Sequence, residues 1–339
     1  MYRQNVSNLS SMHAARTSLS IVIPVLNEAD AISLLLPNLA QTLSQCDIDW
    51  EIVVVDDGGS DQLEAVVTAF EKQDRHRNLQ LIRLSRNFGK EAALTAGLHA
   101  ARGDAVICMD GDGQHPPRLI PKMLEQWKLG YDMVIGTQQS RAAENKWLVW
   151  AKKKFYRFLQ NGERFDIPAN AGDFRLMDRR VVDALLQLPE RTRFMKGLYA
   201  WLGFKTVIEP FDADARTAGS SKFRLRQLIE LASLGITSFS MKPLRMVSGV
   251  GVLISILALG YGFYIIVETL IVGNSLSGWA TLAAGIMLLS GIQLVCLGVI
   301  AEYLGRIFEE AKQRPLYIVD TAMDHSLVGQ AQTMQKISL

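Results

Sequence analysis

The chain has 339 residues, of which 49% are hydrophobic and 21% charged, and its formal net charge is +2. This composition excludes a disordered chain and a collagen-like repeat, and the near-neutral charge argues against a dedicated nucleic-acid binder. The cysteines Cys46, Cys108 and Cys296 are far apart and lack metal-site spacing. We therefore expect neither a disulfide framework nor a cysteine-bound metal.

The first two thirds of the chain predict an α/β domain. Residues 1–17 are polar and are expected to form a flexible tail. After them, short runs rich in Val and Ile alternate with segments that have apolar residues at helical spacing. The predicted strands are Leu19–Pro24, Glu51–Val55, Leu79–Leu84, Ala105–Met109 and Met133–Ile135, and the predicted helices are Ala29–Leu43, Gln62–Lys72 and Glu91–Ala101. This alternation indicates a mainly parallel sheet covered by helices on both faces.

Acidic, amide and glycine residues follow four of these strands, at the sheet edge where open α/β sheets bind ligands. The clusters are Pro24–Glu28, Asp56–Asp61, Ser85–Lys90 and Asp110–His115. One such cluster would be ordinary turn chemistry, whereas four at one edge favour a binding site. Asp57 can accept hydrogen bonds from a nucleoside, and Gly58 and Gly59 allow a ligand to approach the backbone closely.

Asp110 and Asp112 are separated by one residue just past a strand, so both carboxylates can reach one ion. Oxygen ligands suit Mg²⁺ or Mn²⁺, and Gln114 can supply a third oxygen. The alternative is an Asx-type turn between the strand and the next helix. His115, which precedes two prolines, is expected to mark this loop rather than to bind a metal.

Two later motifs combine charged side chains with glycine. Asp173 is expected in a loop before a helix that Asp178 caps. Its carboxylate is a candidate general base or, alternatively, an ion-pair partner of a nearby arginine. The segment Arg216–Lys222 holds two cations and two serines. These groups suit a diphosphate or a lipid phosphate, with a solvated basic loop as the alternative.

The last third of the chain predicts a pair of membrane-spanning helices. Between Met246 and Ala301 the only charged residue is Glu268, and Asn274–Gly278 divides the segment into two apolar runs. Each run, at roughly 22 residues, is long enough to cross a bilayer. Basic residues flank the outer ends and none lies in the turn, which predicts that both ends face the cytoplasm. The alternative is a buried helical hairpin of a soluble domain.

Amphipathic segments adjoin this pair of helices. Phe223–Phe239 has apolar residues at helical spacing beside two arginines, which predicts a helix on the cytoplasmic lipid surface. A second amphipathic helix is expected after Arg306, ending at Pro315. Lys152–Lys154, close to several aromatic residues, is either an interfacial surface or a solvated helix face.

Short motifs along the chain occur in the order of a known family: Ile21–Glu28, Val55–Gly58, Ser85–Glu91, Met109–Pro117, Gly172–Leu176, Ala218–Lys222 and Glu302–Arg306. Together they resemble glycosyltransferase family 2, and more closely its bacterial polyprenyl-phosphate glycosyltransferases, relatives of dolichol-phosphate mannosyltransferase. Each motif is weak alone, but the ordered set is specific. The resemblance implies a GT-A fold, which is Rossmann-like and mainly parallel, followed by juxtamembrane helices and a transmembrane hairpin.

The resemblance also implies an activity. It is inverting transfer of a hexose, expected to be glucose from UDP-glucose, onto undecaprenyl or another polyprenyl phosphate, for cell-surface glycan or lipid modification. A Mg²⁺ or Mn²⁺ cofactor, contact with membrane lipids and a homo-oligomer such as a tetramer are implied, without nucleic acid. The expected location is the bacterial inner membrane, multi-pass, with the catalytic domain in the cytoplasm.

The matched motifs carry roles for individual residues. Those implied for the donor are Pro24, Asn27, Glu28 and Asp57 around the nucleoside, Lys90 and Asp110 elsewhere in the donor site, and Ser220 and Lys222 on phosphate groups. Asp110, Asp112 and Gln114 would arrange the metal ion, and the implied catalytic residues are Asp112, Asp173 and Arg216. Departures from the family pattern are Gly59, Gly113, Arg118 and Gln138, where Ser, Leu, Glu and Arg are usual.

The predicted organisation is a tail at 1–17, a GT-A domain at 18–222, an amphipathic helix at 223–242, two transmembrane helices at 243–304 and a cytoplasmic segment at 305–339. A processive polysaccharide synthase is one alternative, but the chain lacks the Gln-x-x-Arg-Trp motif of those enzymes. A catalytically silent scaffold or transporter subunit is another, which the intact acidic residues disfavour. A sugar nucleotidyltransferase is disfavoured by the membrane helices.

Overall fold

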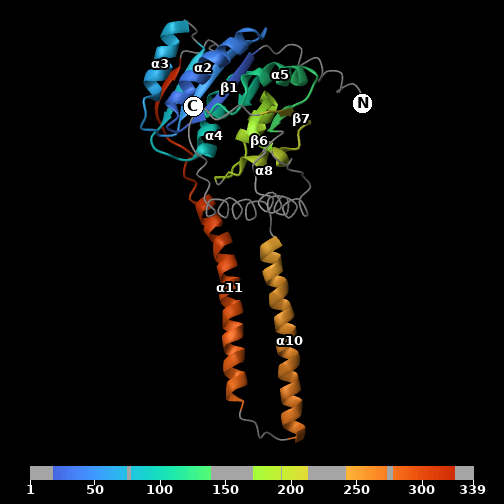
Figure 1. The fold of residues 1–339 in the computed structure, drawn as a ribbon. Helices are drawn as coiled ribbons and strands as arrows, with labels where there is room; N and C mark the ends of the chain where they lie inside the picture. The colour runs from blue at the N-terminus through green and yellow to red at the C-terminus, as the bar shows by residue number, and fades with distance from the viewer. Residues whose placement is uncertain are drawn as a thin grey trace. The chain divides into compact units, whose positions relative to one another are not determined.

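The computed structural model describes residues 18–74, 78–138, 171–191, 193–212, 242–272 and 278–324. The chain divides into two compact units, one that contains a sheet and one that contains two long helices (Figure 1). The sheet unit includes the residues from Arg314 onward, although they follow the helical unit in the chain.

One 8-stranded sheet has the strand order β7-β5-β6-β4-β1-β2-β3-β8. The strands are β1 Ser18–Val25, β2 Asp49–Asp56, β3 Leu79–Leu84, β4 Ala105–Cys108, β5 Met133–Gln138, β6 Ala171–Asp178, β7 Thr206–Phe211 and β8 Val319–Asp324. The central strands β4, β1, β2 and β3 are parallel neighbours, whereas β6 and β8 are antiparallel to the strands beside them. The prediction of a mainly parallel sheet is confirmed.

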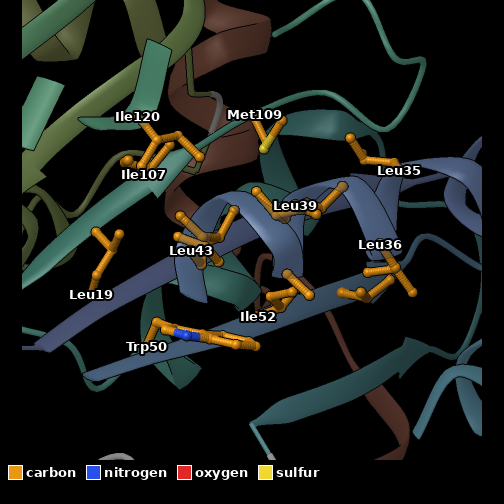
Figure 2. Packing of buried hydrophobic residues seen from close by; sticks show 14 of the residues in the cluster. Leu19, Leu35, Leu36, Leu39, Leu43, Trp50, Ile52, Ile107, Met109 and Ile120 are labelled. Atoms are coloured by element: carbon orange, nitrogen blue, oxygen red, sulfur yellow. The ribbon is translucent and has the colours of Figure 1, made fainter. Parts of the chain in front are cut away.

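Helices pack on both faces of the sheet. The helices α2 (Ala29–Ser44), α3 (Leu63–Asp74) and α5 (Ile120–Lys128) share one buried apolar cluster with the sheet. Figure 2 shows Leu39 and Leu43 of α2 beside Ile107 of β4 and Ile52 of β2. The opposite face carries α4 (Lys90–Ala100), α7 (Arg179–Leu186) and α8 (Met195–Leu202), of which α4 packs on β1 and β2 and α8 on β6.

The structure corrects the prediction for Asp173, which lies inside the strand β6 and not in a loop. Apolar side chains alternate along β6, with Phe174 and Leu176 buried in the main core. Because β6 is antiparallel to β4, the beginning of β6 lies at the edge where β4 ends. Asp173 therefore still reaches the predicted site. Asp178 caps α7 as predicted, since its carboxylate accepts the Arg180 N–H at 3.0 Å.

The second unit consists of α10 (Lys242–Val272) and α11 (Trp279–Ala311). By length and composition both helices can cross a membrane, with candidate spans at Met246–Tyr264 and Leu288–Ala311. Neither candidate span is buried within the structure, which argues against the alternative of a buried soluble hairpin. α11 continues unbroken past Arg306, so the separate amphipathic helix expected there is wrong. The segment Phe223–Phe239 and residues 1–17 lie outside the described residues.

A strand follows α11 that the sequence pattern did not predict. This strand, β8, pairs antiparallel with β3 at the edge of the sheet (Figure 1). The Ser85 amide donates to the Ile318 carbonyl at 2.9 Å, and the Tyr317 hydroxyl lies 3.0 Å from His99 Nδ1 on α4. We call residues 314–324 the return segment. Through the pairing of β8 with β3, this segment contacts the strand that leads into the predicted site.

Candidate active site

The predicted site residues that the structure describes lie at one edge of the sheet, where β1, β2, β3 and β4 end. They are Pro24, Asn27, Glu28, Asp57, Lys90, Asp110, Asp112, Gln114 and, at the start of β6, Asp173. Arg216, Ser220 and Lys222, together with Lys152–Lys154, lie outside the described residues. The edge position follows from parallel strands, whose carboxyl ends meet on one side.

Backbone amides and short polar side chains hold the part of the site next to β1, β2 and β3. Asp57 accepts the amide N–H groups of Phe88 at 2.8 Å and Gly89 at 2.9 Å. Asn27 Oδ1 accepts the Ser60 N–H at 2.8 Å. We call this group the amide cluster, made of Asn27, Asp56, Asp57 and the backbone of Gly59, Ser60, Phe88 and Gly89, in which Asp56 accepts the Gly59 N–H at 2.7 Å. Burial raises the pKa of Asp57, and the two amide hydrogen bonds offset this only in part.

Two residues of this region have left-handed backbone conformations. Gly58 has φ 71°, and a Cβ atom there would clash with the backbone of Arg86 and lie 2.7 Å from Asn87 N. Asn27 has φ 55°, a conformation that Asn tolerates better than most residues. Backbone of this kind persists where the surroundings hold it in place, and it gathers at ligand-binding sites.

Ion pairs hold the part of the site next to β4 and β6. Lys90 Nζ lies 2.7 Å from Asp110 Oδ1 and 2.7 Å from Asp173 Oδ2. The Asp173 side chain is only 13% exposed. Burial opposes its ionisation, but the nearby cations Lys90 and Lys196 outweigh burial and lower the pKa of Asp173 to about 2. Asp173 is therefore a carboxylate at any physiological pH.

The structure adds residues to this region that sequence reasoning missed. Glu91 follows Lys90 at the start of α4, and Lys196 lies in the first turn of α8. Arg175 lies in β6 and Tyr199 in α8. The Arg175 guanidinium stacks on the Tyr199 ring at 3.6 Å. The charge cluster is our name for Lys90, Glu91, Asp110, Asp173 and Lys196. No local sequence motif could have indicated this cluster, because its members come from four separate segments of the chain.

Buried oxygen atoms in the charge cluster lack hydrogen-bond partners within the part of the chain that the structure describes. They are Asp173 Oδ1 and Glu91 Oε2, with Tyr199 Oη nearby. The buried Glu51, at the other edge of the sheet, gives the contrast. It accepts from Ser20 Oγ at 2.6 Å, Arg102 N at 2.7 Å and Gln80 Nε2 at 2.9 Å. Because unpaired buried polar atoms are costly, those near Asp173 indicate that a polar ligand completes the site.

Burial and charge act together on Glu91. Burial raises its pKa, the neighbouring Asp173 carboxylate raises it further, and the value reaches about 8 although Lys90 and Lys196 act in the opposite direction. Glu91 is therefore mainly protonated at neutral pH. The charge cluster, which does not include Arg175, then carries two carboxylates and two ammonium groups.

The Asp110–Asp112 turn fits a divalent cation bound with help from a ligand. Asp112 Oδ1 accepts the Gln114 N–H at 3.1 Å, and a Cβ on Gly111 would lie 2.9 Å from Glu28 Oε2. Over the described ranges, no group of three His, Cys, Asp or Glu side chains is arranged to hold a metal ion alone. One or two carboxylates plus substrate phosphates are the usual magnesium site. The donor set therefore fits Mg²⁺ or Mn²⁺ only when a phosphate is present.

His115 supports this turn through a hydrogen bond to its backbone. Its Nδ1 accepts the Asp110 N–H at 2.9 Å, which places the ring proton on Nε2. The ring stacks on Phe174 with centroids 4.7 Å apart. Burial lowers the pKa of His115, so the ring is neutral at neutral pH. The prediction of a structural role agrees with these contacts.

Comparison with known proteins identifies the family. Residues 20–186 match the model of Glycosyl transferase family 2, and residues 242–307 match the GtrB C-terminal hairpin. The chain belongs to glycosyltransferase family 2, and its sheet is of the GT-A type.

Relatives match over most of their length. An uncharacterized glycosyltransferase of Synechocystis sp. is 44% identical, covering 89% of this chain and 94% of the relative. The bactoprenol glucosyl transferase of Shigella phage SfV is 39% identical, covering 89% of this chain and 97% of the relative. A solved glucosyl-3-phosphoglycerate synthase from Mycobacterium tuberculosis is a distant neighbour, at 18% identity and a TM-score of 0.45 over 68% of this chain and 81% of the other.

Proposed function

We propose that this glycosyltransferase moves glucose from UDP-glucose to undecaprenyl phosphate or a similar polyprenyl phosphate. The family membership supports glycosyl transfer, and the bactoprenol glucosyl transferase relatives support this donor sugar and acceptor. The observation that carries the proposal is Lys90, which joins Asp110 of the predicted metal turn to Asp173. It puts the expected diphosphate and sugar positions side by side.

The amide cluster would bind the nucleoside, and Asp110 and Asp112 would hold Mg²⁺ or Mn²⁺ against the diphosphate. When bound, such an ion neutralises charge on the departing nucleoside diphosphate. Lys90 supplies a further positive charge at the same place, where fixed charges are most effective in stabilising a transition state.

Asp173 is proposed to orient the sugar and not to remove a proton. A group with a pKa of about 2 is a weak base, and base strength governs general-base catalysis. The acceptor, a phosphate monoester, is already ionised near neutral pH and needs little deprotonation. The unpaired Asp173 Oδ1 is available to accept a sugar hydroxyl.

The helical unit is proposed to anchor the enzyme at the cytoplasmic face of the bacterial inner membrane, next to its lipid acceptor. β8 follows α11 and yet pairs with β3, so polypeptide from before α10 and after α11 belongs to one sheet. Two membrane crossings would return the chain to the side that it left, which supports this topology because β8 pairs with β3. The basic residues outside the apolar runs favour the cytoplasmic side.

The test is release of UDP from UDP-glucose by the purified full-length protein, with and without undecaprenyl phosphate and with Mg²⁺, Mn²⁺ or a chelator. We expect lipid-dependent release, loss of activity with the chelator, and a glucosylated lipid product detected by mass spectrometry. A panel of UDP-sugars and GDP-mannose identifies the donor. Lipid-independent hydrolysis alone, or no glucosylated lipid with any donor, would contradict the proposal.

Asp112→Asn provides the matched variant in this assay. It keeps the size of the side chain and removes the charge that would face the cation. We expect at least a tenfold rise in the Mn²⁺ concentration for half-maximal activity. Asp30→Asn, on the exposed surface of α2, should leave the metal dependence unchanged.

A further inference from the structure

Lys196 is a cation in an unfavourable place. It lies in the first turn of α8, where the helix macrodipole is positive and repels a cation. Its side chain is partly buried, and this burial lowers the pKa of Lys196. Repulsion by Lys90 and Arg175 lowers the pKa further, whereas attraction by Asp173 raises it. The helix macrodipole, burial and the two neighbouring cations each make a charged lysine here costly for folding.

No carboxylate in the described part of the chain pairs directly with this lysine. Among the described residues, Lys196 forms no ion pair within 4 Å, whereas Lys90, Lys122 and Lys312 each do. Asp173 is close enough to influence its charge, but Asp173 is already paired with Lys90 at 2.7 Å. Within that part of the chain the positive charge of Lys196 is not paired with a carboxylate, so it can attract an anionic ligand.

The position of Lys196 follows from the sheet. Phe174 and Leu176 of β6 point into the main core, so Asp173 and Arg175 point to the opposite face, where α4 and α8 pack. Arg175 contacts Tyr199, which lies one turn after Lys196 on α8. Lys90 at the start of α4 pairs with Asp173, and Lys196 at the start of α8 is on the same face and close enough to influence the charge of Asp173.

The two cations differ in what they are available to bind. Lys90 is held between Asp110 and Asp173, on the side of the predicted metal turn. Lys196 has no such partner in the ranges that the structure describes. In the proposed reaction a second anion, the acceptor phosphate, must reach the sugar. We infer that Lys196 binds the phosphate of the acceptor lipid, an inference that depends on the proposed function for the identity of that anion.

The test separates acceptor binding from donor binding. Lys196→Met removes the charge and keeps an unbranched side chain, Lys196→Arg keeps the charge, and Lys205→Met removes an exposed lysine on the same segment as a control. Binding of undecaprenyl phosphate in detergent micelles and of UDP-glucose with Mn²⁺ is measured by calorimetry, and KM is measured for each. Melting temperature reports on folding.

We expect Lys196→Met to weaken undecaprenyl phosphate binding and raise its KM by about 10- to 100-fold, the usual loss for a hydrogen bond to a charged group. UDP-glucose binding should change less than twofold, and Lys196→Arg should recover most of the loss. The melting temperature of Lys196→Met should equal or exceed that of the wild type, because an unfavourable cation is removed. Lys205→Met should match the wild type throughout.

Several results would overturn the inference. Equal weakening of both substrates, weakening of UDP-glucose alone, or a lower melting temperature with unchanged lipid binding would assign Lys196 to the donor site or to folding. If the wild type binds undecaprenyl phosphate but transfers no glucose, the proposed function fails while the binding comparison still decides the role of Lys196. If the wild type does not bind this lipid at all, both proposals fail.

Discussion

Asp57 and Asp173 lie at the same edge of the sheet and are both shielded from water, but they are stabilised by different kinds of partner. Asp57, in the amide cluster, accepts two backbone N–H groups, and burial leaves its pKa raised. Asp173, in the charge cluster, is paired with Lys90, and its pKa is lowered to about 2. One carboxylate is held by dipoles fixed in the main chain and the other by the ammonium group at the end of a lysine side chain.

This difference suits the two parts of the proposed donor. Backbone dipoles cannot move away, so the amide cluster offers fixed geometry for an uncharged group such as a nucleoside. An ammonium group can change partners when a metal ion and a diphosphate arrive. In the proposed reaction the charge cluster would accommodate the change in charge that sugar transfer brings, while the amide cluster would hold the nucleoside in place.

The largest effect should come from removing the cation of the charge cluster. Lys90→Met leaves Asp110 and Asp173 without the ammonium that lies between them, and we expect turnover to fall by about a hundredfold, as for other losses of positioning. The pKa of Asp173 should also rise, because Lys90 is the main cause of its low value. The acid limb of the pH–rate profile should then move to higher pH.

Lys122→Met is the matched control, since Lys122 pairs with Glu209 away from the site. Lys90→Arg keeps the charge and should retain more activity than Lys90→Met. Turnover of Lys90→Met within threefold of the wild type, with an unchanged pH profile, would show that the charge cluster does not control the reaction.

The next effect should come from the backbone of the amide cluster. Gly58→Ala places a Cβ against the Arg86 backbone at a left-handed φ of 71°, and neither the backbone nor the conformation can adjust cheaply. We expect a loss of about 2–4 kcal/mol in stability, from clash and strain combined, and weaker UDP-glucose binding. Thermal unfolding and calorimetry measure the two effects.

Gly59→Ala is a close comparison. Its Cβ would meet the Asp56 and Asn27 side chains at 2.8 and 3.2 Å, and Gly59 lacks a positive φ. Since side chains can move, Gly59→Ala should cost clearly less than Gly58→Ala. Equal costs would indicate that the rigid backbone of the amide cluster is not what makes Gly58 necessary.

The two clusters also differ in how far the sequence predicts them. The strands β1 to β5 and the polar residues that follow them were predicted, because buried parallel strands are continuous apolar runs with turn residues at their ends. The amide cluster uses those local signals, and its residues come together at one edge of the sheet. The roles assigned to Asn27, Glu28 and Asp57 remain predictions.

The charge cluster depends on pairing between distant segments, which leaves no local pattern. Asp173 was expected in a glycine-containing loop before the helix that Asp178 caps, whereas antiparallel pairing with β4 and β5 makes this segment a strand. β7 and β8 were also missed, since the exposed positions of these edge-region strands interrupt their apolar pattern. Glu91 and Lys196 are ordinary helix-start residues until α4 and α8 pack on the same face.

A smaller effect should appear when Glu91 is made permanently neutral. In the folded protein its pKa is about 8, against about 4.3 in an unfolded chain. The folded state therefore binds the proton more tightly, and wild-type stability falls as pH rises from about 4 to about 8. Glu91→Gln should remove this loss and raise the melting temperature above that of the wild type at pH 8.

The difference in melting temperature between Glu91→Gln and the wild type should grow between pH 5 and pH 8 and then level off. Glu125→Gln, on α5, is the control and should show no such trend. A constant difference across this range would mean that Glu91 is not protonated in the folded protein, and that the charge cluster carries one more negative charge than inferred.

The smallest effect should come from the return segment, which connects the sheet beside the amide cluster to the chain beyond α11. β8 pairs with β3, and β3 leads into the Phe88 and Gly89 amides that hold Asp57. Tyr317→Phe removes one hydroxyl, 3.0 Å from His99 Nδ1, and should cost about 0.5–1.5 kcal/mol. Because the loss is local, hydrogen exchange of the Ser85 amide, which donates to Ile318, should quicken while the melting temperature hardly changes.

Tyr131→Phe is the control and should leave the hydrogen exchange of Ser85 unaffected. If Ser85 exchanges no faster in Tyr317→Phe, the amide cluster is rigid without support from the return segment, and its stability comes from the β2–β3 loops alone.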